Sequence, residues 1–272
     1  MHSRPISRVL LSLGMLLVLA ACGSSPKNIT LAEQTEASSA AADKGGATVD
    51  VGDIATQPIR YARNKPGCSG TCPRVEVDSI ALPQAPKLTQ LIDRVLAYMT
   101  GINPDQVGDY QTLAQYEAYF WQTAQTRDVT RFVAKIKDAH NGLITVELAT
   151  NQYLTGAAHG IPATQYLNWE RDRQRVLALS EAVIPAQQAA FVAAAKRAHV
   201  RWKQQNEDYQ RDPATFDRMW PFQETDNFAL TTAGLVLKYD AYAIAPYASG
   251  QPELLIPYAE LSGVLDPKWL PK

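Results

Sequence analysis

Apolar and polar side chains along residues 57–154 repeat with the periods of strands and helices. The predicted strands, in which apolar and polar residues alternate, are 57–64, 73–82, 128–139 and 143–154. The predicted helices, with apolar residues every three or four positions, are 86–101 and 110–126. The third and fourth strands flank Asn141-Gly142, a pair that supplies the positive φ angles of a tight turn and so predicts a hairpin.

The second half of the chain continues with the same two patterns. Two further strands are predicted within 163–172 and 175–184, the second ending in a short helical turn. A long helix is predicted from Pro185 to Asn206. The last block, 226–261, predicts a strand, a glycine turn, a strand, an aromatic loop and a strand.

These elements mix strands and helices without regular β-α-β alternation. Such an order is typical of an α+β fold, with largely antiparallel sheets and amphipathic helices packed on them. The part after residue 56, a little over two hundred residues, is long enough for one large domain or two small ones. We expect two sub-domains, at 57–153 and 154–272.

The first 22 residues have the plan of a bacterial lipoprotein signal. Arg4 and Arg8 precede an apolar run from Val9 to Ala21, about 13 residues, which is too short to cross a hydrocarbon core of about 30 Å. The run ends in Leu-Ala-Ala before Cys22, which matches the lipobox. We therefore expect residues 1–21 to be a signal peptide and Cys22 to carry lipid, the alternative being an uncleaved signal anchor.

A lipidated Cys22 would tether the protein to a membrane without spanning it. Gly23 rather than Asp follows the cysteine, which favours the outer membrane, facing the periplasm, in a bacterium with two membranes. Residues 22–56 are rich in Ser, Ala, Gly, Glu and Lys, a composition typical of a flexible linker.

The charge balance argues against nucleic acid as a partner. Loss of residues 1–21 removes two arginines and changes the formal net charge from −1 to −3. Binding to a nucleic-acid backbone needs a clustered positive surface, which a slightly acidic chain is not expected to present.

Two cysteines, Cys68 and Cys72, remain once Cys22 carries lipid. In an oxidising envelope we expect them to close a small disulfide loop between the first two predicted strands. The alternatives are free thiols or a zinc site, but two thiols with no histidine or further cysteine nearby cannot supply four zinc ligands. No metal or other cofactor is expected.

The segment TGAAHG, residues 155–160, places a histidine beside glycine directly after a predicted strand, where side chains often reach a cleft. Three roles are open for His159: it is a structural residue of the turn, it contacts a ligand, or it acts as a catalytic base. The chain has no H-E-x-x-H or G-x-S-x-G motif to supply a metal site or a nucleophile elbow. We therefore predict no catalytic residue, and Thr155 and His159 are candidate ligand-binding residues.

The loop YDAYAIAPYASG, residues 239–250, carries two further candidates. Tyr242 and Tyr247 could contact sugars or a partner protein, because tyrosine combines a large apolar face with a polar tip. The alternative is that both rings pin a long connection onto the sheet. Tyr247, which precedes small residues, is expected to be the more exposed ring. The aromatic segment DRMWPF, 217–222, either covers a cavity or caps the sheet.

Several of these motifs together resemble a known family. TGAAHG and the segment 228–258 are similar to the C-terminal domain of RsiV-type anti-sigma factors, whose usual forms are T-G-G-A-H-G and F-x-Φ-T-x-x-G-Φ-x-Φ-x-Φ-x-x-Y-x-I-A-P-Y-A-x-G, with Φ apolar. Ala157 stands where that family has glycine. The preceding part, including Cys68 and Cys72-Pro73, is similar to the accessory domain of PdaC-type peptidoglycan deacetylases.

The resemblance implies binding rather than catalysis. RsiV-type proteins span a membrane and bind lysozyme, whereas this sequence has neither a spanning helix nor a sigma-binding segment. The metal-binding residues of the deacetylase catalytic domain have no match here. We expect a lipid-anchored envelope protein that binds a cell-wall component or a secreted protein such as a lysozyme-like hydrolase. A peptidoglycan hydrolase and a structural envelope lipoprotein are the alternatives.

Overall fold

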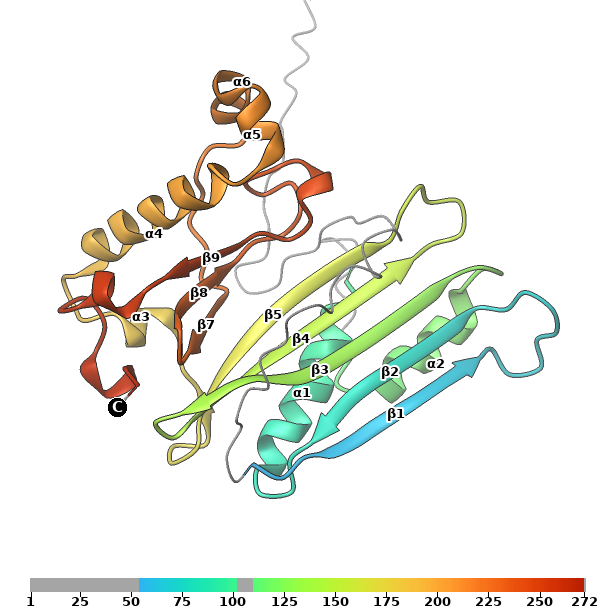
Figure 1. Cartoon of the computed structure of the whole chain (residues 1–272). Helices are drawn as coiled ribbons and strands as arrows, with labels where there is room; N and C mark the ends of the chain where they lie inside the picture. Colours follow the sequence, from blue (N-terminus) through green and yellow to red (C-terminus); the bar gives the residue numbers. More distant parts are fainter. Residues whose placement is uncertain (1–53, 102–109, 272) are drawn as a thin grey trace, which may run out of the picture.

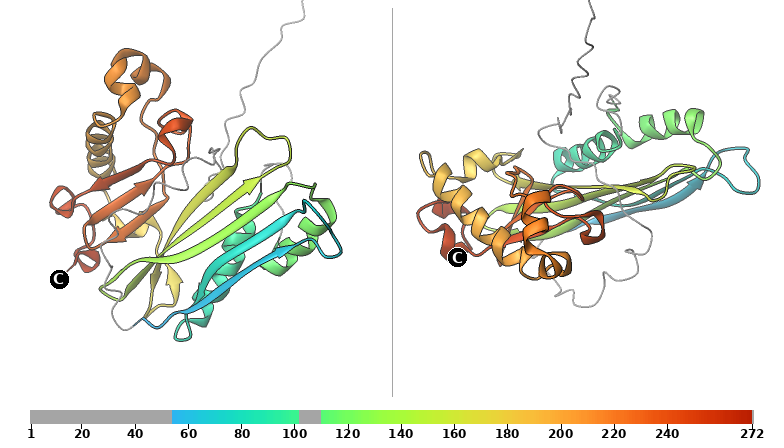
Figure 2. Two further views of the ribbon diagram at one scale, coloured as in Figure 1. Left: turned by 45° about the vertical axis from the view of Figure 1, so that its right-hand side comes forward. Right: turned by 90° about the horizontal axis from the view of Figure 1, so that it is seen from above.

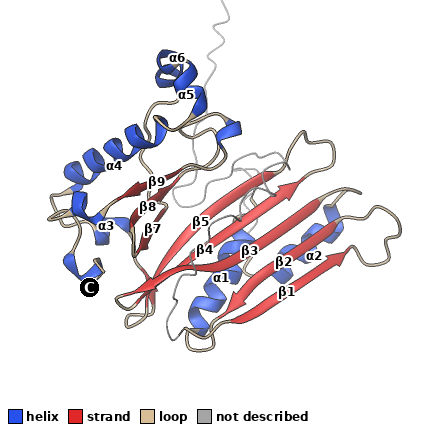
Figure 3. Cartoon of the chain, viewed as in Figure 1, coloured by secondary structure: helices blue, strands red, loops and turns tan. Residues whose placement is uncertain are grey.

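The computed structural model of the chain describes residues 54–101 and 110–271 (Figure 1). The predicted signal peptide, Cys22 and nearly all of the predicted linker lie outside the described residues. A long sheet with two helices on one face lies beside a smaller sheet that carries its own helices (Figures 1 and 3). The predicted α+β class, with largely antiparallel sheets, is confirmed.

Six strands form the long sheet, in the order β1-β2-β3-β4-β5-β6. They are β1 Gln57–Asn64, β2 Arg74–Ala81, β3 Val129–His140, β4 Leu143–Tyr153, β5 Ile161–Glu170 and β6 Arg175–Val176. Neighbouring strands are antiparallel except β2 and β3, which run parallel with Val75 opposite Thr130. Parallel neighbours need a crossover connection, and the helices between β2 and β3 form it.

The predicted disulfide is present in the loop between β1 and β2, where Cys68 is bonded to Cys72. The base of this loop is closed by the N–H of Lys65, which donates to the carbonyl of Pro73 at 3.0 Å. Both cysteines lie away from the hydrophobic core. The disulfide therefore fixes the hairpin connection rather than the interior.

Two helices, α1 Pro86–Tyr98 and α2 Leu113–Thr123, cover one face of the long sheet (Figure 2). Thr112 caps α2, because its Oγ1 accepts from the N–H of Gln115 at 3.2 Å. The side chains that meet in this first core come from both helices and from alternate positions of the strands: Val75, Val77, Leu88, Ile92, Leu96, Phe120, Phe132, Val146 and Leu148. Leu88, Ile92 and Leu96 of α1 are four residues apart, the spacing expected for one face of the predicted helix.

The turn between β3 and β4 has the geometry that Asn-Gly predicts. Asn141 has φ 47° and Gly142 has φ 75°, both in the left-handed region that a two-residue hairpin turn requires. The register of the hairpin pairs His140 with Leu143 directly across the turn.

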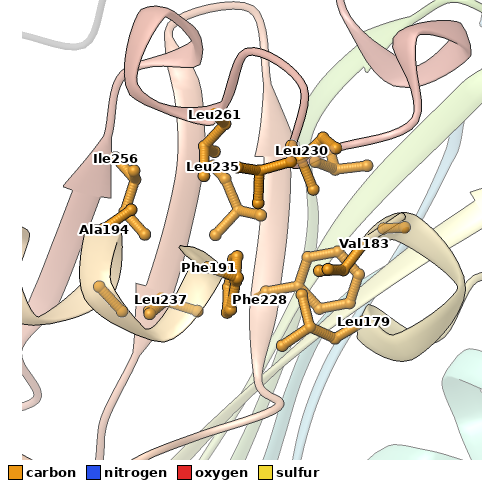
Figure 4. Close-up of a cluster of buried hydrophobic side chains, with 14 of the residues drawn as sticks. Leu179, Val183, Phe191, Ala194, Phe228, Leu230, Leu235, Leu237, Ile256 and Leu261 are labelled. Atoms are coloured by element: carbon orange, nitrogen blue, oxygen red, sulfur yellow. The ribbon is translucent and has the colours of Figure 1, made fainter. Parts of the chain in front are cut away.

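The smaller sheet contains β7 Phe228–Thr231, β8 Gly234–Lys238 and β9 Glu253–Ile256, all antiparallel. Its helices are α3 Leu179–Ala182, α4 Gln188–Lys203, α5 Glu207–Arg211 and α6 Pro213–Met219. Figure 4 shows the second core, in which Phe191 and Ala194 of α4 pack among Leu235, Leu237 and Ile256. The helix predicted to start at Pro185 starts at Gln188.

The smaller sheet packs on the face of the long sheet opposite α1 and α2, and buried side chains of β4 and β5 bind its edge strand. Asn168 accepts a hydrogen bond from the N–H of Leu230 and donates one to the carbonyl of Phe228, both at 2.8 Å. Thr145 donates from Oγ1 to the carbonyl of Leu230 at 2.8 Å. The outer edge of β7 is thus paired by side chains instead of by another strand.

The predicted sub-domain boundary between residues 153 and 154 falls in the connection between β4 and β5. These two strands pair over ten residue positions, from Leu143 opposite Glu170 to Gln152 opposite Ile161. Trp169 of β5 belongs to the first core, whereas Leu177 belongs to the second. The packing therefore assigns β5 to the long sheet, and the second core begins after it, apart from Leu143.

Candidate binding site

The loop between β8 and β9, residues 239–252, carries both predicted tyrosines. Its two ends are joined where the N–H of Tyr239 donates to the carbonyl of Pro252 at 2.9 Å. Toward its C-terminal end, the loop contains the short 3-10 helix Tyr247–Ser249, where Oγ of Ser249 accepts a hydrogen bond from Nδ2 of Asn206 at 2.8 Å. We call residues 239–252 the aromatic loop; hydrogen bonds hold it both at its base and at this helix.

Four rings form a continuous row along the aromatic loop. This aromatic row consists of His159, Tyr247, Tyr242 and Trp220 in that order. The centroid separations are 4.6 Å for His159 and Tyr247, 5.5 Å for Tyr247 and Tyr242, and 6.2 Å for Tyr242 and Trp220. The angles between successive ring planes are 22°, 33° and 27°. The first and last pairs are stacked and the middle pair is tilted, all within the centroid range in which aromatic rings attract each other.

Three segments far apart in the sequence meet in the aromatic row. His159 comes from the connection between β4 and β5, Trp220 from the residues after α6, and the two tyrosines from the aromatic loop. The structure therefore brings together three of the four ligand-binding candidates, His159, Tyr242 and Tyr247. Trp220 lies in the predicted aromatic segment 217–222 and contacts the row, whereas Phe222 of the same segment packs against the second core.

The exposure of the two tyrosines is the reverse of the prediction. Tyr242 is 47% exposed, whereas Tyr247 is only partly exposed. Tyr247 begins a 3-10 helix and stacks on His159, and these contacts bury it. The small residues after Tyr247 do not determine its exposure, because the ring packs on a distant segment of the chain.

The backbone of Tyr242 adopts a left-handed conformation, with φ 66°. For a bulky residue other than glycine this conformation costs roughly 1 to 2 kcal/mol, and such strain concentrates at ligand sites. The strained backbone presents a half-exposed ring between Tyr247 and Trp220. This combination of strain and exposure distinguishes Tyr242 from a ring that only packs the loop onto the sheet.

Thr155, the fourth candidate, is engaged in a turn at the start of β3. Its N–H donates to Oδ1 of Asp128 at 2.6 Å, and its Oγ1 accepts from the N–H of Arg127 at 3.0 Å. These bonds anchor the TGAAHG segment, so Thr155 has a structural role in positioning the chain that leads to His159.

A buried carboxyl lies at the base of the aromatic loop. Asp240 is 5% exposed, and neither of its carboxylate oxygens has a partner with full hydrogen-bond geometry among the described residues, the Gln251 side chain being the polar group nearest in effect. Burial raises the pKa of the Asp240 carboxyl to about 7, against the opposing effects of the Gln251 side chain and the Lys238 ammonium. Sequence reasoning missed Asp240, because nothing in the local pattern shows that its side chain turns inward.

The carboxyl of Glu253 has the opposite character. Tyr166 donates to it from its hydroxyl at 2.7 Å and Lys238 from its ammonium at 3.0 Å. Although burial favours the neutral form, Lys238 and the Tyr166 hydroxyl hold the pKa of Glu253 at about 2. Glu253 is therefore an ionised structural group that joins β9 to β8 and β5.

The acidic and histidine side chains outside the aromatic loop are engaged in structural contacts or stand apart. Among them, no three His, Cys, Asp or Glu side chains are grouped so as to hold a metal ion. His140 is paired with Asp138 at 2.9 Å, but Asp138 also binds the N–H and Oγ1 of Thr232 and so serves to fix a turn. Within the same residues no helix is long and apolar enough to span a bilayer.

Comparison with known proteins identifies the family. The family model described as a protein of unknown function, DUF3298, matches residues 181–259, which include most of the second core. The crystal structure of a DUF3298 family protein from Pseudomonas aeruginosa PAO1 is 36% identical, with a TM-score of 0.73, and the match covers 82% of this chain and 99% of that chain.

A second DUF3298 family structure, from Bacteroides fragilis NCTC 9343, is 18% identical with a TM-score of 0.63, and the match covers 80% of this chain and 96% of that chain. At that identity the likeness is one of fold alone. No curated protein matches the sequence. With a relative this similar over nearly its full length, the chain belongs to the DUF3298 family.

Proposed function

We propose that this protein is a lipid-anchored, non-catalytic binding protein of the bacterial envelope that uses the aromatic row to bind the glycan strands of the cell wall. Residues 1–21 would direct export, Cys22 would carry the lipid, and the linker to residue 56 would give the folded part its reach. The basis for this location is the basic, apolar and small-residue pattern that ends at Cys22.

The half-exposed Tyr242 carries the proposal for the ligand. Its ring is held between Tyr247 and Trp220 on a strained backbone. Sugar rings present faces of C–H groups that pack on aromatic side chains, while their hydroxyls take hydrogen bonds from a polar rim, the usual composition of a ligand site. A row of rings therefore suits an extended glycan better than a compact polar ligand.

A secreted protein such as a lysozyme-like hydrolase is the second candidate ligand. One observation favours it: Met219, which directly precedes Trp220, is 58% exposed. Exposed Met and Tyr side chains are enriched at protein interfaces, and Tyr242 is the other exposed side chain beside the partly buried Trp220. The resemblance to lysozyme-binding RsiV-type domains supports the same candidate.

Co-sedimentation of the purified full chain with insoluble peptidoglycan tests the proposal. We expect the wild type to sediment with the glycan and Tyr242→Ala to remain in the supernatant. Tyr119→Ala is the matched control, because Tyr119 on α2 is also 47% exposed. Retention on immobilised lysozyme without sedimentation would favour the second candidate. Release of soluble glycan fragments would instead favour a hydrolase, and failure of all three would leave a structural lipoprotein.

A further inference from the structure

The two ends of the aromatic loop meet in a buried polar contact. Asp240 follows the first residue of the loop, and Gln251 precedes its last. Oε1 of Gln251 accepts a hydrogen bond from Oγ1 of Thr164, on β5, at 2.8 Å. Nε2 of Gln251 is buried without a partner among the described residues, and the Gln251 side chain is close enough to Asp240 to lower the pKa of its carboxyl. Asp240 is thus next to the residue that ties the loop to the long sheet.

The charged groups around Asp240 leave its carboxyl poorly compensated when ionised. Lys238, the cation that acts on it, binds Oε1 of Glu253 at 3.0 Å and the carbonyl of Gln251 at 3.2 Å. Glu253 also faces Lys137 of β3 at 3.6 Å and the hydroxyl of Tyr166 on β5. Lys137 in turn binds Glu147 of β4 at 3.2 Å. The nearby cations are therefore shared with other carboxylates.

A buried carboxylate that its polar neighbours compensate poorly is costly, whereas a protonated carboxyl in the same place costs much less. When the loop opens, water reaches the carboxyl and its pKa returns toward the ordinary 3.8 from about 7. Opening the loop and releasing the proton are thus thermodynamically linked.

We propose that Asp240 is a protonation-dependent latch, which in its neutral form holds the aromatic loop closed and the aromatic row assembled, and on losing its proton favours opening of the loop. The latch would regulate the aromatic row. Its effect on ligand binding therefore rests on the proposed function: the ligand should bind more weakly at alkaline pH than at mildly acidic pH.

Linkage fixes the shape of the pH dependence. The closed loop binds a proton that the open loop has lost between the two pKa values, so the opening constant rises by up to about tenfold for each pH unit there, and by about fiftyfold in all between pH 5 and 7. Above about pH 8 both states are ionised, and the opening constant levels off. The Asp240→Asn variant has no such proton, and its opening constant is therefore independent of pH over this range.

Hydrogen exchange of the full chain, read as protection factors for residues 241–250 and corrected for intrinsic exchange rates, tests the latch without any ligand. We expect the wild type to lose about fiftyfold in protection between pH 5 and 7 and about twofold more up to pH 8.5. Asp240→Asn should give a flat profile, and Asp172→Asn, at an exposed carboxyl in the loop after β5, should behave as the wild type.

A flat wild-type profile would overturn the proposal, and that result does not depend on the folding of any variant. A profile that still titrates in Asp240→Asn would assign the proton to another group and would overturn the proposal equally. Sedimentation with peptidoglycan at pH 6 and pH 8 distinguishes a failure of the latch from a failure of the proposed function. A titrating loop in a protein that binds no glycan at either pH would sustain the latch and contradict the ligand.

Discussion

The imidazole of His159 stacks on the ring of Tyr247, with the two centroids 4.6 Å apart. His159 precedes β5 of the long sheet, whereas Tyr247 belongs to the aromatic loop of the smaller sheet. The contact joins the two sheets at one end of the aromatic row. The role that this position supports for His159 is to hold Tyr247, and through it the exposed Tyr242, in place.

The left-handed backbone of Tyr242 predicts an unusual order of stability among substitutions. Tyr242→Gly should be about 1 kcal/mol more stable than Tyr242→Ala, because glycine adopts φ 66° without the steric cost that alanine pays. Both variants lose the same ring contacts, so the comparison isolates the backbone. Urea unfolding of the two variants measures the difference, and equal or greater stability of the alanine variant would show that the backbone is not strained.

Because Asp240 is buried, we expect the Asp240→Asn variant to gain stability relative to the wild type as the pH rises. The folded-state pKa is about 7, above the ordinary 3.8, so the wild type loses stability as pH rises from about 4 to 7. Asp240→Asn removes that loss. Its free energy of unfolding relative to the wild type should increase by about 3 kcal/mol between pH 5 and pH 8. Thermal or urea unfolding at the two pH values provides the test, and a difference independent of pH would contradict the buried titration.

The hydrogen bonds of Asn168 lead us to expect that the stability of the fold depends strongly on the contact between the two sheets. Asn168→Ala leaves the N–H of Leu230 and the carbonyl of Phe228 without their buried partner. The expected loss is about 3 to 5 kcal/mol in the free energy of unfolding. Asn64→Ala, at an exposed position of β1, is the control and should cost less than about 0.5 kcal/mol. A loss below about 1 kcal/mol at Asn168 would mean that the sheets associate mainly through apolar contacts.

Elements that depend on local chemistry were predictable. The Asn141-Gly142 turn, the hairpin closed by Cys68 and Cys72, and the amphipathic helices follow from residue types at fixed spacing. The helices α5 and α6 were not predicted, although Asn206 and Asp212 cap them and Pro213 stands at the start of α6. Their short length hides any apolar period, so only the capping residues signal them.

Relationships that depend on distant segments were not predictable in the same way. The parallel pairing of β2 with β3, and the continuation of the long sheet through β5, depend on packing between segments that the sequence pattern treats separately. The same holds at the site. His159, Tyr242 and Tyr247 were named from residue type and loop context, whereas the inward turn of Asp240 and the stacking of Trp220 on Tyr242 arise only in the folded chain.

The affinity of the full chain for a soluble N-acetylglucosamine-containing glycan fragment, measured by isothermal titration calorimetry, tests the binding role of the aromatic row most directly. Loss of a ring contact worth about 1.4 kcal/mol corresponds to a tenfold change in affinity. Tyr242→Ala should therefore bind at least about tenfold more weakly than the wild type, while Tyr119→Ala, with the same 47% exposure on α2, should bind as the wild type does. Equal affinity of the wild type and Tyr242→Ala, or no binding by the wild type, would contradict a glycan site at the aromatic row.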